Sequence, residues 1–321
     1  MNSSKAIGGF HGLDLGRGMS LHKNAILLGS GRNCFEYVLR ASKFRHAYLP
    51  KFTCDVMLEP LTKLNIPYTL YSVNDQLELE GELNLKADEC LVYTNYFGLK
   101  SAYSERLSAK YGAQLVLDYS QAFYAQPPAG SQVFYSPRKF FGLPDGGCLY
   151  AQAKLEEDLP VAISHDRAGH LLRRVDLGPE AAYPTFQANE QALSGRPLER
   201  MSALTRGLLG NLDYAAARAA RRANYAVLHE ALGSTNGLKL ELAEHDVPLA
   251  YPYLAGSPTL RGELVSRKIF VPQYWPNVLE WCDKTERDYQ LSANLLPLPI
   301  DQRYGRAEME RILEVLDESL H

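Results

Sequence analysis

Cysteine is scarce in this 321-residue chain and is scattered through it. The five cysteines are odd in number and never stand in the C-x-x-C spacing of a zinc or redox site; they occupy positions 34, 54, 90, 148 and 282. Such usage is typical of reduced thiols, so we expect a cytoplasmic protein without a disulfide framework. The eight histidines show no H-x-x-H or H-E-x-x-H spacing, so no metal site is expected.

Long apolar runs and a strong net charge are also missing. No stretch approaches the roughly 18 to 20 apolar residues that span a bilayer, and residues 1–10 contain no apolar run of signal-peptide length. The net charge is −3, whereas binding to a nucleic-acid backbone requires a basic excess. We therefore expect neither a membrane nor a nucleic acid as partner. The composition, 46% hydrophobic and 22% charged, is that of an ordinary soluble globular protein.

Between residues 25 and 150, short apolar runs alternate with helical patterns. A helix is expected after Gly31, because Phe35, Val38 and Leu39 recur on one face. Alternating strands and helices predict an α/β fold with a mostly parallel sheet covered on both faces. The expected strands are residues 25–28, 47–50, 68–73, 90–93, 114–118, 132–135 and 148–150, and further helices are expected from Thr53 and over about 102–111.

The rest of the chain has a less regular pattern. Residues 153–200 are weakly periodic and contain proline, glycine and charge, so we expect them to form a connection across the surface. One long helix is expected from Met201 to about Leu232, with its arginines exposed to solvent. A second, smaller α/β unit follows. These patterns predict a large domain of residues 1–205 and a smaller domain of residues 206–321.

Two strand ends carry groups that suit ligand binding, since ligands of open α/β sheets lie beyond the carboxyl ends of the strands. Gly29-Ser-Gly-Arg-Asn33 joins a strand to a helix, so its backbone N–H groups could hold a phosphate with help from the helix dipole. The alternative is a tight turn that needs its two glycines. Asp118 ends another strand and could keep a pyridine nitrogen protonated. A helix N-cap is the alternative there.

A third segment, Phe134-Tyr-Ser-Pro-Arg-Lys-Phe-Phe-Gly-Leu-Pro-Asp-Gly-Gly147, places Lys139 among aromatic and apolar residues. Lysine avoids burial unless it is functional, so Lys139 is expected to be a buried Schiff-base amine and proton shuttle. Ser136 is expected to reach the same phosphate as the glycine turn. A surface lysine whose stem packs on apolar neighbours is the alternative.

Together these segments resemble those of the DegT/StrS-like sugar aminotransferases, pyridoxal-phosphate (PLP) enzymes of the aspartate-aminotransferase fold. The resemblance runs from about Gly29 to the C-terminal Leu296-Pro-Leu-Pro-Ile300. Asp118-Tyr-Ser-Gln121 is similar to the family's Asp-x-x-Gln/His, and Lys139 to its Schiff-base lysine. The other similar motifs are Ser30-Gly-Arg-Asn33, Pro50-Lys-Phe-Thr53, Tyr96-Phe-Gly98, Asp145-Gly-Gly147 and Arg200-Met-Ser202.

The resemblance implies a role for individual residues. Lys139 and Asp118 would be catalytic: Lys139 would carry PLP, and Asp118 would pair with its pyridine nitrogen. Gln121 would lie beside the ring, together with Cys54. The residues implied at the phosphate are Ser30, Gly31, Arg32, Asn33 and Ser136, and those implied at the substrate or the partner subunit are Tyr96, Phe97 and Arg200.

Some positions depart from the family's pattern. Cys54 stands where the family usually has a Trp or Phe stacked on the cofactor ring, and Phe97 or Tyr93 could replace it. The family's serine five residues before the lysine is Phe134 here, so Ser136 is expected to take over. The Asn that usually reaches the partner subunit's cofactor falls at Leu198. The chain is also short in the middle region, where the family grips nucleotide sugars.

For the activity, the resemblance implies transamination of a keto-sugar, nucleotide-linked, with an amino acid such as glutamate as donor. It also implies a homodimer whose partner chain completes the site. The family's dehydratases carry histidine in place of the lysine, so Lys139 favours aminotransfer. Two alternatives stay open. One is a PLP enzyme acting on a small keto acid or another polysaccharide-pathway intermediate; the other is a non-enzymatic binding protein on a degenerate version of this fold.

Overall fold

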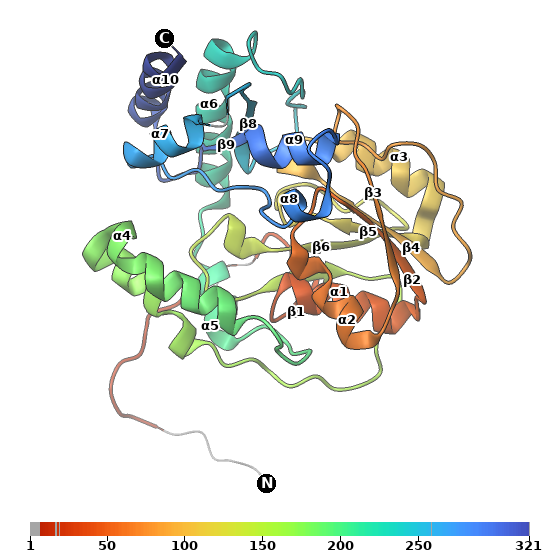
Figure 1. Ribbon diagram of the computed structural model, residues 1–321. Coiled ribbons are helices and arrows are strands. Elements are labelled where there is room, and N and C mark those ends of the chain that lie inside the picture. Colours follow the sequence, from red (N-terminus) through yellow and green to blue (C-terminus); the bar gives the residue numbers. More distant parts are fainter. Residues whose placement is uncertain (1–6, 17, 19, 258, 321) are drawn as a thin grey trace.

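A seven-stranded sheet lies at the centre of the structure (Figure 1). The computed structural model describes residues 7–16, 18, 20–257 and 259–320. The strand order is β1-β7-β6-β5-β4-β2-β3, with the run from β6 to β3 parallel and β7 antiparallel to both β6 and β1. The strands are β1 (Ile26–Leu28), β2 (His46–Pro50), β3 (Tyr68–Tyr71), β4 (Glu89–Thr94), β5 (Leu115–Asp118), β6 (Gln132–Tyr135) and β7 (Gly147–Tyr150).

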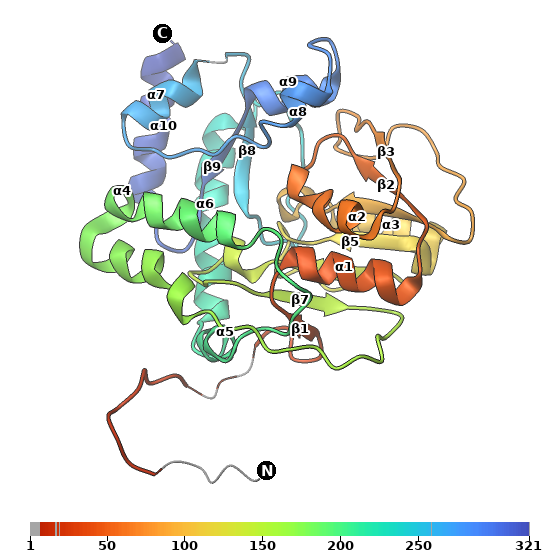
Figure 2. The same ribbon diagram turned by 60° about the horizontal axis from the view of Figure 1, so that its bottom comes forward.

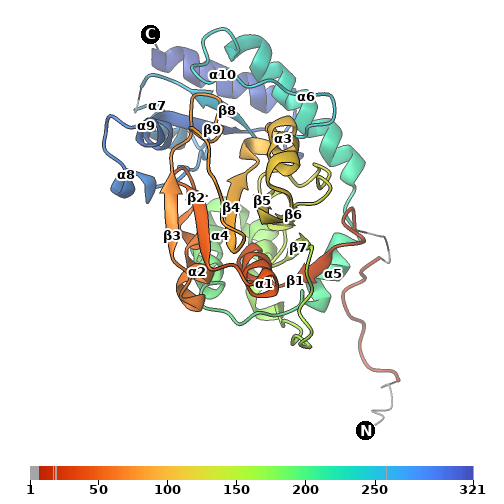
Figure 3. The ribbon, with the colours of Figure 1, turned by 90° about the vertical axis from the view of Figure 1, so that its right-hand side faces the viewer.

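Helices cover both faces of this sheet (Figure 3). On β4, Val92 joins the apolar cluster under α1 (Gly31–Ser42) and α2 (Glu59–Leu64), whereas Leu91 and Tyr93 join the cluster that includes Leu107 of α3 (Ser101–Tyr111). All residues of β4, β5 and β6 are buried, as expected for parallel strands packed on both sides. The α/β fold and the mostly parallel sheet predicted from the sequence are confirmed.

Residues 153–200, expected to form a weakly periodic connection across the surface, contain a helical hairpin, α4 (Gly169–Ala192), that was not predicted from the sequence. Gly178, with φ 83° and ψ 177°, divides α4 into two helical runs that lie side by side (Figure 2). Pro179 opens the second run, where a missing N–H is tolerated. The glycine and two prolines interrupt the apolar periodicity, and this interruption hid the hairpin in the sequence.

The expected single helix from Met201 to Leu232 is also wrong, because the chain forms α5 (Ala203–Leu209) and α6 (Tyr214–Leu232). Each helix has its own N-cap: Ser202 accepts from the Thr205 N–H at 3.1 Å, and Asp213 accepts from the Ala216 N–H at 2.9 Å. The helix expected from Thr53 begins as a short 3-10 turn, η1 (Asp55–Met57), before α2. The other 3-10 turns are η2 (Tyr96–Gly98), η3 (Gly112–Gln114), η4 (Pro137–Lys139) and η5 (His165–Arg167).

A smaller α/β part follows at the C-terminus, as the sequence predicted. Its two antiparallel strands are β8 (Ala250–Leu254) and β9 (Leu295–Pro299). Around them lie α6, α7 (Leu260–Ser266), α8 (Val278–Trp281), α9 (Arg287–Asn294) and α10 (Arg306–Leu320). The boundary at residue 205 stays a prediction. Within the described ranges, no helix is long and apolar enough to cross a membrane, and no cluster of three or more potential metal ligands occurs in the same ranges.

Candidate active site

The candidate site residues gather at one edge of the sheet, where the parallel strands β4, β5 and β6 end. Thr94 at the end of β4 is in register with Asp118 of β5, and Asp118 with Phe134 of β6. Lys139 ends the η4 turn that directly follows β6. The topology therefore brings the segments after three neighbouring strands together, as the sequence predicted for a ligand site.

A hydrogen-bonded chain connects Lys139 to Asp118 through Ser120. The Lys139 Nζ donates to the Ser120 hydroxyl at 3.1 Å, and the Ser120 backbone N–H donates to the Asp118 carboxylate at 2.8 Å. Asp118 is buried. Because its carboxylate accepts the N–H of the residue two positions later, it caps a turn, and no helix begins there. The sequence interpretation did not single out Ser120. It could have been found from its position two residues after Asp118, because a tight turn there brings the chain back towards the carboxylate.

Lys139 is exposed, so the expectation that it would be buried is wrong. Its apolar neighbours Phe140, Phe141 and Leu143 are all buried, and they take the core positions of the loop. The lysine side chain projects from the opposite side of the η4 turn towards Ser120 and a cavity. An apolar sequence environment therefore did not mean an apolar spatial environment here.

Gln121 lies fully buried beside this chain of hydrogen bonds. Its side-chain oxygen accepts the Phe97 backbone N–H at 2.7 Å. Its amide nitrogen, Nε2, has no hydrogen-bond partner in the described part of the chain. Phe97 has a positive φ of 58°, unusual for a bulky residue, and the hydrogen bond that its N–H donates to Gln121 holds it there. A buried donor without an acceptor is a group that a ligand could satisfy.

The glycine turn packs directly on the Asp145-Gly-Gly147 segment. The Gly146 N–H donates to the Gly29 carbonyl at 2.7 Å. A Cβ at Gly147 would lie 2.5 Å from the Ser30 carbonyl oxygen, so only glycine fits there. Ser30 is the N-cap of α1 and accepts from the Asn33 N–H at 3.1 Å. The turn is thus held rigidly with the first N–H groups of α1 facing outwards from the helix end.

The remaining members of the predicted phosphate group have different surroundings. A Cβ at Gly31 would be 3.9 Å from the Ser136 Cβ, so the glycine turn and Ser136 are neighbours. Arg32 forms an ion pair with Glu59 at 3.2 Å. Asn33 donates its side-chain amide to the Pro197 carbonyl at 3.0 Å, so it ties α1 to the connection before α5.

Cys54, half-buried after β2, lies close to the lysine. Burial raises the pKa of its thiol, and the nearby Lys139 cation partly offsets that rise. Phe97 is fully buried, and its ring stacks on Tyr274 at 6.1 Å between centroids. The Tyr93 hydroxyl donates to the Leu77 carbonyl. Phe97 and Tyr93 were the two aromatic residues considered as replacements for the ring that is missing at Cys54. Of these, Phe97 is the one whose backbone is hydrogen-bonded to Gln121.

Tyr96 and Arg200 were expected at the substrate or the partner subunit, and Leu198 stands where the family's Asn would reach the partner. Tyr96 is fully buried, and its hydroxyl donates to the Phe52 carbonyl at 2.8 Å. Arg200 is exposed and forms an ion pair with Asp158 at 3.6 Å. Leu198 is buried in the apolar cluster under α1, so it packs within its own chain.

Sequence reasoning missed a buried charge network behind the glycine turn. The Asp145 carboxylate is fully buried and pairs with Arg167 at 2.8 Å. It also accepts hydrogen bonds from the hydroxyls of Ser202 and Thr205. This network joins the segment after the lysine loop to η5, just before the hairpin α4, and to the start of α5. The sequence signal was the acidic residue before Gly146-Gly147, which was compared only with a family motif.

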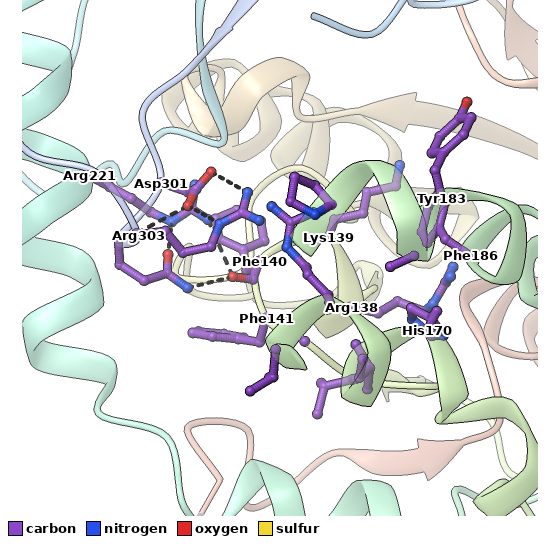
Figure 4. A pocket seen from close by; sticks show the side chains of 18 residues that line it. Arg138, Lys139, Phe140, Phe141, His170, Tyr183, Phe186, Arg221, Asp301 and Arg303 are labelled. Atoms are coloured by element: carbon purple, nitrogen blue, oxygen red, sulfur yellow. Dashed lines mark hydrogen bonds and ion pairs between the residues drawn. The ribbon is translucent and has the colours of Figure 1, made fainter. Parts of the chain in front are cut away.

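A cavity of about 640 Å³ opens beside Lys139 (Figure 4). Its walls come from the lysine loop (residues 138–143), the hairpin α4 and the turn after β9. Figure 4 shows a polar cluster on one side and a mainly aromatic group on the other. The polar cluster is Arg221, Asp301 and Arg303, and the other group is His170, Tyr183 and Phe186. The rings of Tyr183 and Phe186 are stacked, with centroids 6.2 Å apart.

Arg221 fixes the floor of this cavity, which corrects the expectation that the arginines of this helix face solvent. It is only 1% exposed, and it donates to the carbonyls of Leu249 and Phe140 at 2.9 and 3.3 Å. Burial lowers the pKa of Arg221 to about 10. The signal was its place on the apolar stripe of α6, between buried Ala217 and Tyr225.

No family model matches this chain, and no curated protein is similar to it in sequence. Solved structures do match it in fold. A DegT DnrJ EryC1 StrS aminotransferase from Brucella abortus is 13% identical, with 92% of this chain and 85% of that one covered and a TM-score of 0.59.

Two further structures have the same TM-score of 0.59. DesV from S. venezuelae, in complex with a ketimine intermediate, is 14% identical over 92% of this chain and 84% of that one. DesI, in the presence of its TDP-sugar product, is 15% identical over 91% of this chain and 79% of that one. The chain therefore has, over nearly its whole length, the fold of the DegT/DnrJ/EryC1/StrS aminotransferases that its motifs resemble.

Proposed function

We propose that this protein is a PLP-dependent aminotransferase acting on a keto-sugar. The observation that carries the proposal is the Lys139–Ser120–Asp118 chain of hydrogen bonds at the strand ends of an aminotransferase fold. An amine and a carboxylate joined in this way, beside a cavity of about 640 Å³, are the groups that amino transfer requires. The cavity is within the usual range for small-molecule sites.

The residues present fit PLP. Asp118 would hold the proton on the pyridine nitrogen, and the unpaired Gln121 Nε2 offers a buried donor beside the ring. Ser136 and the N-terminus of α1 offer donors for the phosphate. Cys54, close to Lys139, and Phe97, bonded to Gln121, would be the candidates to contact the faces of the cofactor ring. A carboxylate, a buried amide donor and a helix N-terminus are the kinds of group that the ring nitrogen, the ring hydroxyl and the phosphate of PLP would require.

Each of these residues has a definite task in the proposed reaction. Bound PLP supplies an electron sink for the carbon from which a proton is removed. The Lys139 amine moves that proton at its Nζ, a type of general acid–base catalysis worth roughly 10²- to 10⁴-fold in rate. The Ser120 hydroxyl orients the amine, and the Asp118 carboxylate keeps the ring nitrogen charged. Lys139 is exposed and its residue lines the cavity, so a substrate held there would lie beside the lysine.

We further propose that the keto-sugar is nucleotide-linked and that an amino acid such as glutamate is the donor. The cavity is lined by Arg138, Arg174, Arg221 and Arg303, which suits an anionic substrate. A smaller cavity of about 220 Å³ adjoins it, and Arg174 and Arg303 line both. The stacked rings of Tyr183 and Phe186 offer a platform for a planar base. DesI, one of the proteins with this fold, was solved with its TDP-sugar product.

The proposal includes a homodimer in which residues 185–200 of one chain, with Arg200, approach the site of the other. Large apolar side chains are exposed on the hairpin α4 and just before it, which suits a surface that becomes buried on association. They are Ile163, Leu172, Val175, Leu177, Tyr183 and Phe186.

The absorbance spectrum of the purified protein with added PLP tests the proposal most directly. We expect a visible absorbance band from lysine-bound cofactor. Borohydride reduction followed by mass spectrometry should place the cofactor on Lys139. Lys139→Ala should lose both the band and all aminotransfer while its circular dichroism stays unchanged. Cofactor on another lysine would refute the assignment, and failure to bind PLP would favour a non-enzymatic binding protein.

A screen of amino donors and keto acceptors then tests the substrate. We expect amino transfer to a nucleotide-linked keto-sugar with glutamate as donor. Turnover of small keto acids alone, with no activity on keto-sugars, would replace this substrate class with the smaller one.

A further inference from the structure

Arg221 of α6 stands where an apolar residue would be expected. It lies on the buried stripe of the helix, between Ala217 and Tyr225, and only 1% of it is exposed. Burial lowers the pKa of Arg221 to about 10, so the guanidinium is still charged near neutral pH. Burying a charge costs free energy that an apolar residue at the same place would not. The arginine therefore calls for an explanation beyond packing.

The hydrogen-bond acceptors of Arg221 come from separate parts of the chain. Its Nη2 donates to the Phe140 carbonyl at 3.3 Å, a contact drawn in Figure 4. Its Nη1 donates to the Leu249 carbonyl at 2.9 Å, and its Nε to the side-chain oxygen of Gln302 at 3.0 Å. All three acceptors are neutral, so what these bonds provide is a fixed arrangement of segments and not the neutralisation of a charge.

Phe140, the residue directly after Lys139, is held by its backbone and by its ring. Its carbonyl ends the η4 turn, where no helix continues to satisfy it. This carbonyl accepts from the side-chain amide of Gln302 at 2.8 Å as well as from Arg221. The guanidinium also lies over the Phe140 ring, 4.5 Å from Cζ to the centroid, a cation–π contact. Phe140 cannot shift without breaking these contacts.

Leu249 extends the same network to the other wall of the site. Its carbonyl accepts from Arg221, and its N–H donates to the Phe97 carbonyl at 2.9 Å. The Phe97 N–H in turn donates to Gln121. One buried guanidinium therefore connects the lysine loop, the smaller C-terminal part and the segment that follows β4.

We propose that Arg221 and Gln302 are positioning residues that hold the Phe140 carbonyl and thereby keep the Lys139 amine at the Ser120 hydroxyl. The role rests on the proposed function, in which this amine transfers a proton. The amine and the hydroxyl are 3.1 Å apart, and a hydrogen bond weakens steeply as its geometry departs from the ideal. A displacement of about 1 Å at a reacting group can lower a rate by about 10²-fold.

Hydrogen exchange of the purified full-length chain tests whether the loop is held. The amides of residues 139–141 donate to the carbonyls of residues 136 and 137 within the η4 turn. In Arg221→Met and in Gln302→Met these amides should exchange faster, because the turn loses its anchor. The amides of strands β4, β5 and β6 should exchange as in the wild type, whereas a general loss of stability would accelerate them too.

Chemical labelling tests the position of the amine itself. Acetic anhydride should modify Lys139 about 2- to 10-fold faster in these variants, the effect expected when one hydrogen bond no longer holds the amine. The exposed Lys154 serves as the internal reference, and mass spectrometry measures both. Arg221→Lys should lie between the wild type and Arg221→Met, since an ammonium group has no planar fork and cannot reach all of the acceptors at once.

Two further variants keep the test sharp if Arg221→Met does not fold. Gln302→Glu keeps an acceptor for the Arg221 Nε but removes the donor to Phe140, so the loop should still be released. Arg222→Met is the matched control. Arg222 follows Arg221 in the same helix and also donates to backbone carbonyls, but these lie in the segment before β8, away from the lysine loop. Its substitution should change neither exchange nor labelling of the loop.

Steady-state kinetics with PLP bound separates positioning from direct contact with substrate. A positioning role predicts that kcat falls by about 10- to 100-fold in Gln302→Glu and in Arg221→Met, while KM changes little. A raised KM with unchanged kcat and unchanged labelling of Lys139 would indicate substrate contact and would overturn the proposal. Wild-type exchange and labelling in the folded variants would overturn it as well.

Failure of the proposed function would give a different result. If the wild-type protein does not bind PLP, the aminotransferase assignment fails. Exchange and labelling still show whether Arg221 and Gln302 hold the lysine, and faster rates in their variants would support that hold. If PLP binds and amino transfer occurs, but the loop and the amine behave as in the wild type in every variant, only the positioning role fails.

Discussion

Removing Arg167 is expected to destabilise the protein severely. Arg167 and Asp145 form an ion pair at 2.8 Å in which the carboxylate is fully buried and the guanidinium is nearly so. In Arg167→Met, Asp145 keeps only the hydroxyl donors of Ser202 and Thr205. Breaking a buried pair by removing one partner costs about 3–5 kcal/mol, because an uncompensated charge stays in the interior. The free energy of unfolding should fall by that amount.

Urea unfolding followed by circular dichroism measures this effect. The midpoint should fall while the slope with urea stays unchanged, which shows that stability and not compactness has altered. Arg306→Met is the matched control, since Arg306 and Glu310 form a pair at 2.7 Å with both side chains exposed. Its cost should be about 0–1 kcal/mol. The double variant Asp145→Asn with Arg167→Met should recover part of the loss, because no charge is then left unpaired. A cost for Arg167→Met as small as that of Arg306→Met would refute the reasoning.

Four further predictions concern the site, the assembly and pH. Asp118→Asn should keep the cofactor but lose most turnover, because an amide cannot hold the pyridinium proton by charge; near-wild-type kcat would make Asp118 a structural cap. Ser120→Ala should lower kcat more than KM by releasing the Lys139 amine, whereas unchanged steady-state kinetics would remove Ser120 from the mechanism. Sedimentation should give a dimer at micromolar concentration, and an active monomer would contradict it. Burial lowers the pKa of His22 from 6.5 to about 4. The free energy of unfolding should therefore decrease by up to about 3 kcal/mol as the pH falls from 7 through 4, because the unfolded chain binds a proton that the folded protein does not. His22→Phe should reduce this dependence on pH, and an unchanged dependence would exclude His22 as its source.

The strands and the order of the catalytic segments could be predicted from the sequence. Runs such as Leu115–Asp118 are apolar on both faces and end at a polar residue. This local pattern is enough to predict both that the strand is buried and where it ends. Helix α4 could not be predicted in this way, because Gly178 and its prolines break the periodicity that identifies a helix. The break at Gly210 was missed although Gly210-Asn211 is a turn signal, because the long Ala- and Arg-rich pattern after it dominated the interpretation and the cap at Asp213 was not recognised.

The contacts of the site needed the structure. Lys139 is surrounded by apolar residues in sequence, but η4 turns those residues inwards and the amine outwards. Arg221 is one arginine among several in α6, and only packing against the lysine loop distinguishes it. Ser120 and Gln121 follow Asp118 directly, yet their partners, Lys139 and Phe97, lie 19 and 24 residues away along the chain. Such tertiary pairings are not encoded in local periodicity.

The position of β1 has a consequence for the order in which the protein assembles. Ile26 of β1 pairs with Leu149 of β7, and on the other side of β1 the Met201 N–H donates to the Leu27 carbonyl. The ribosome therefore synthesises the glycine turn at the end of β1 early, but β7 and residue 201, which pack beside β1, are synthesised much later. Contacts so distant in sequence close slowly, because long loops must first be ordered. A nascent chain that ends before Gly147 would have its parallel strands but no anchored turn, so ligand binding should arise only after residue 201 has emerged and folded back.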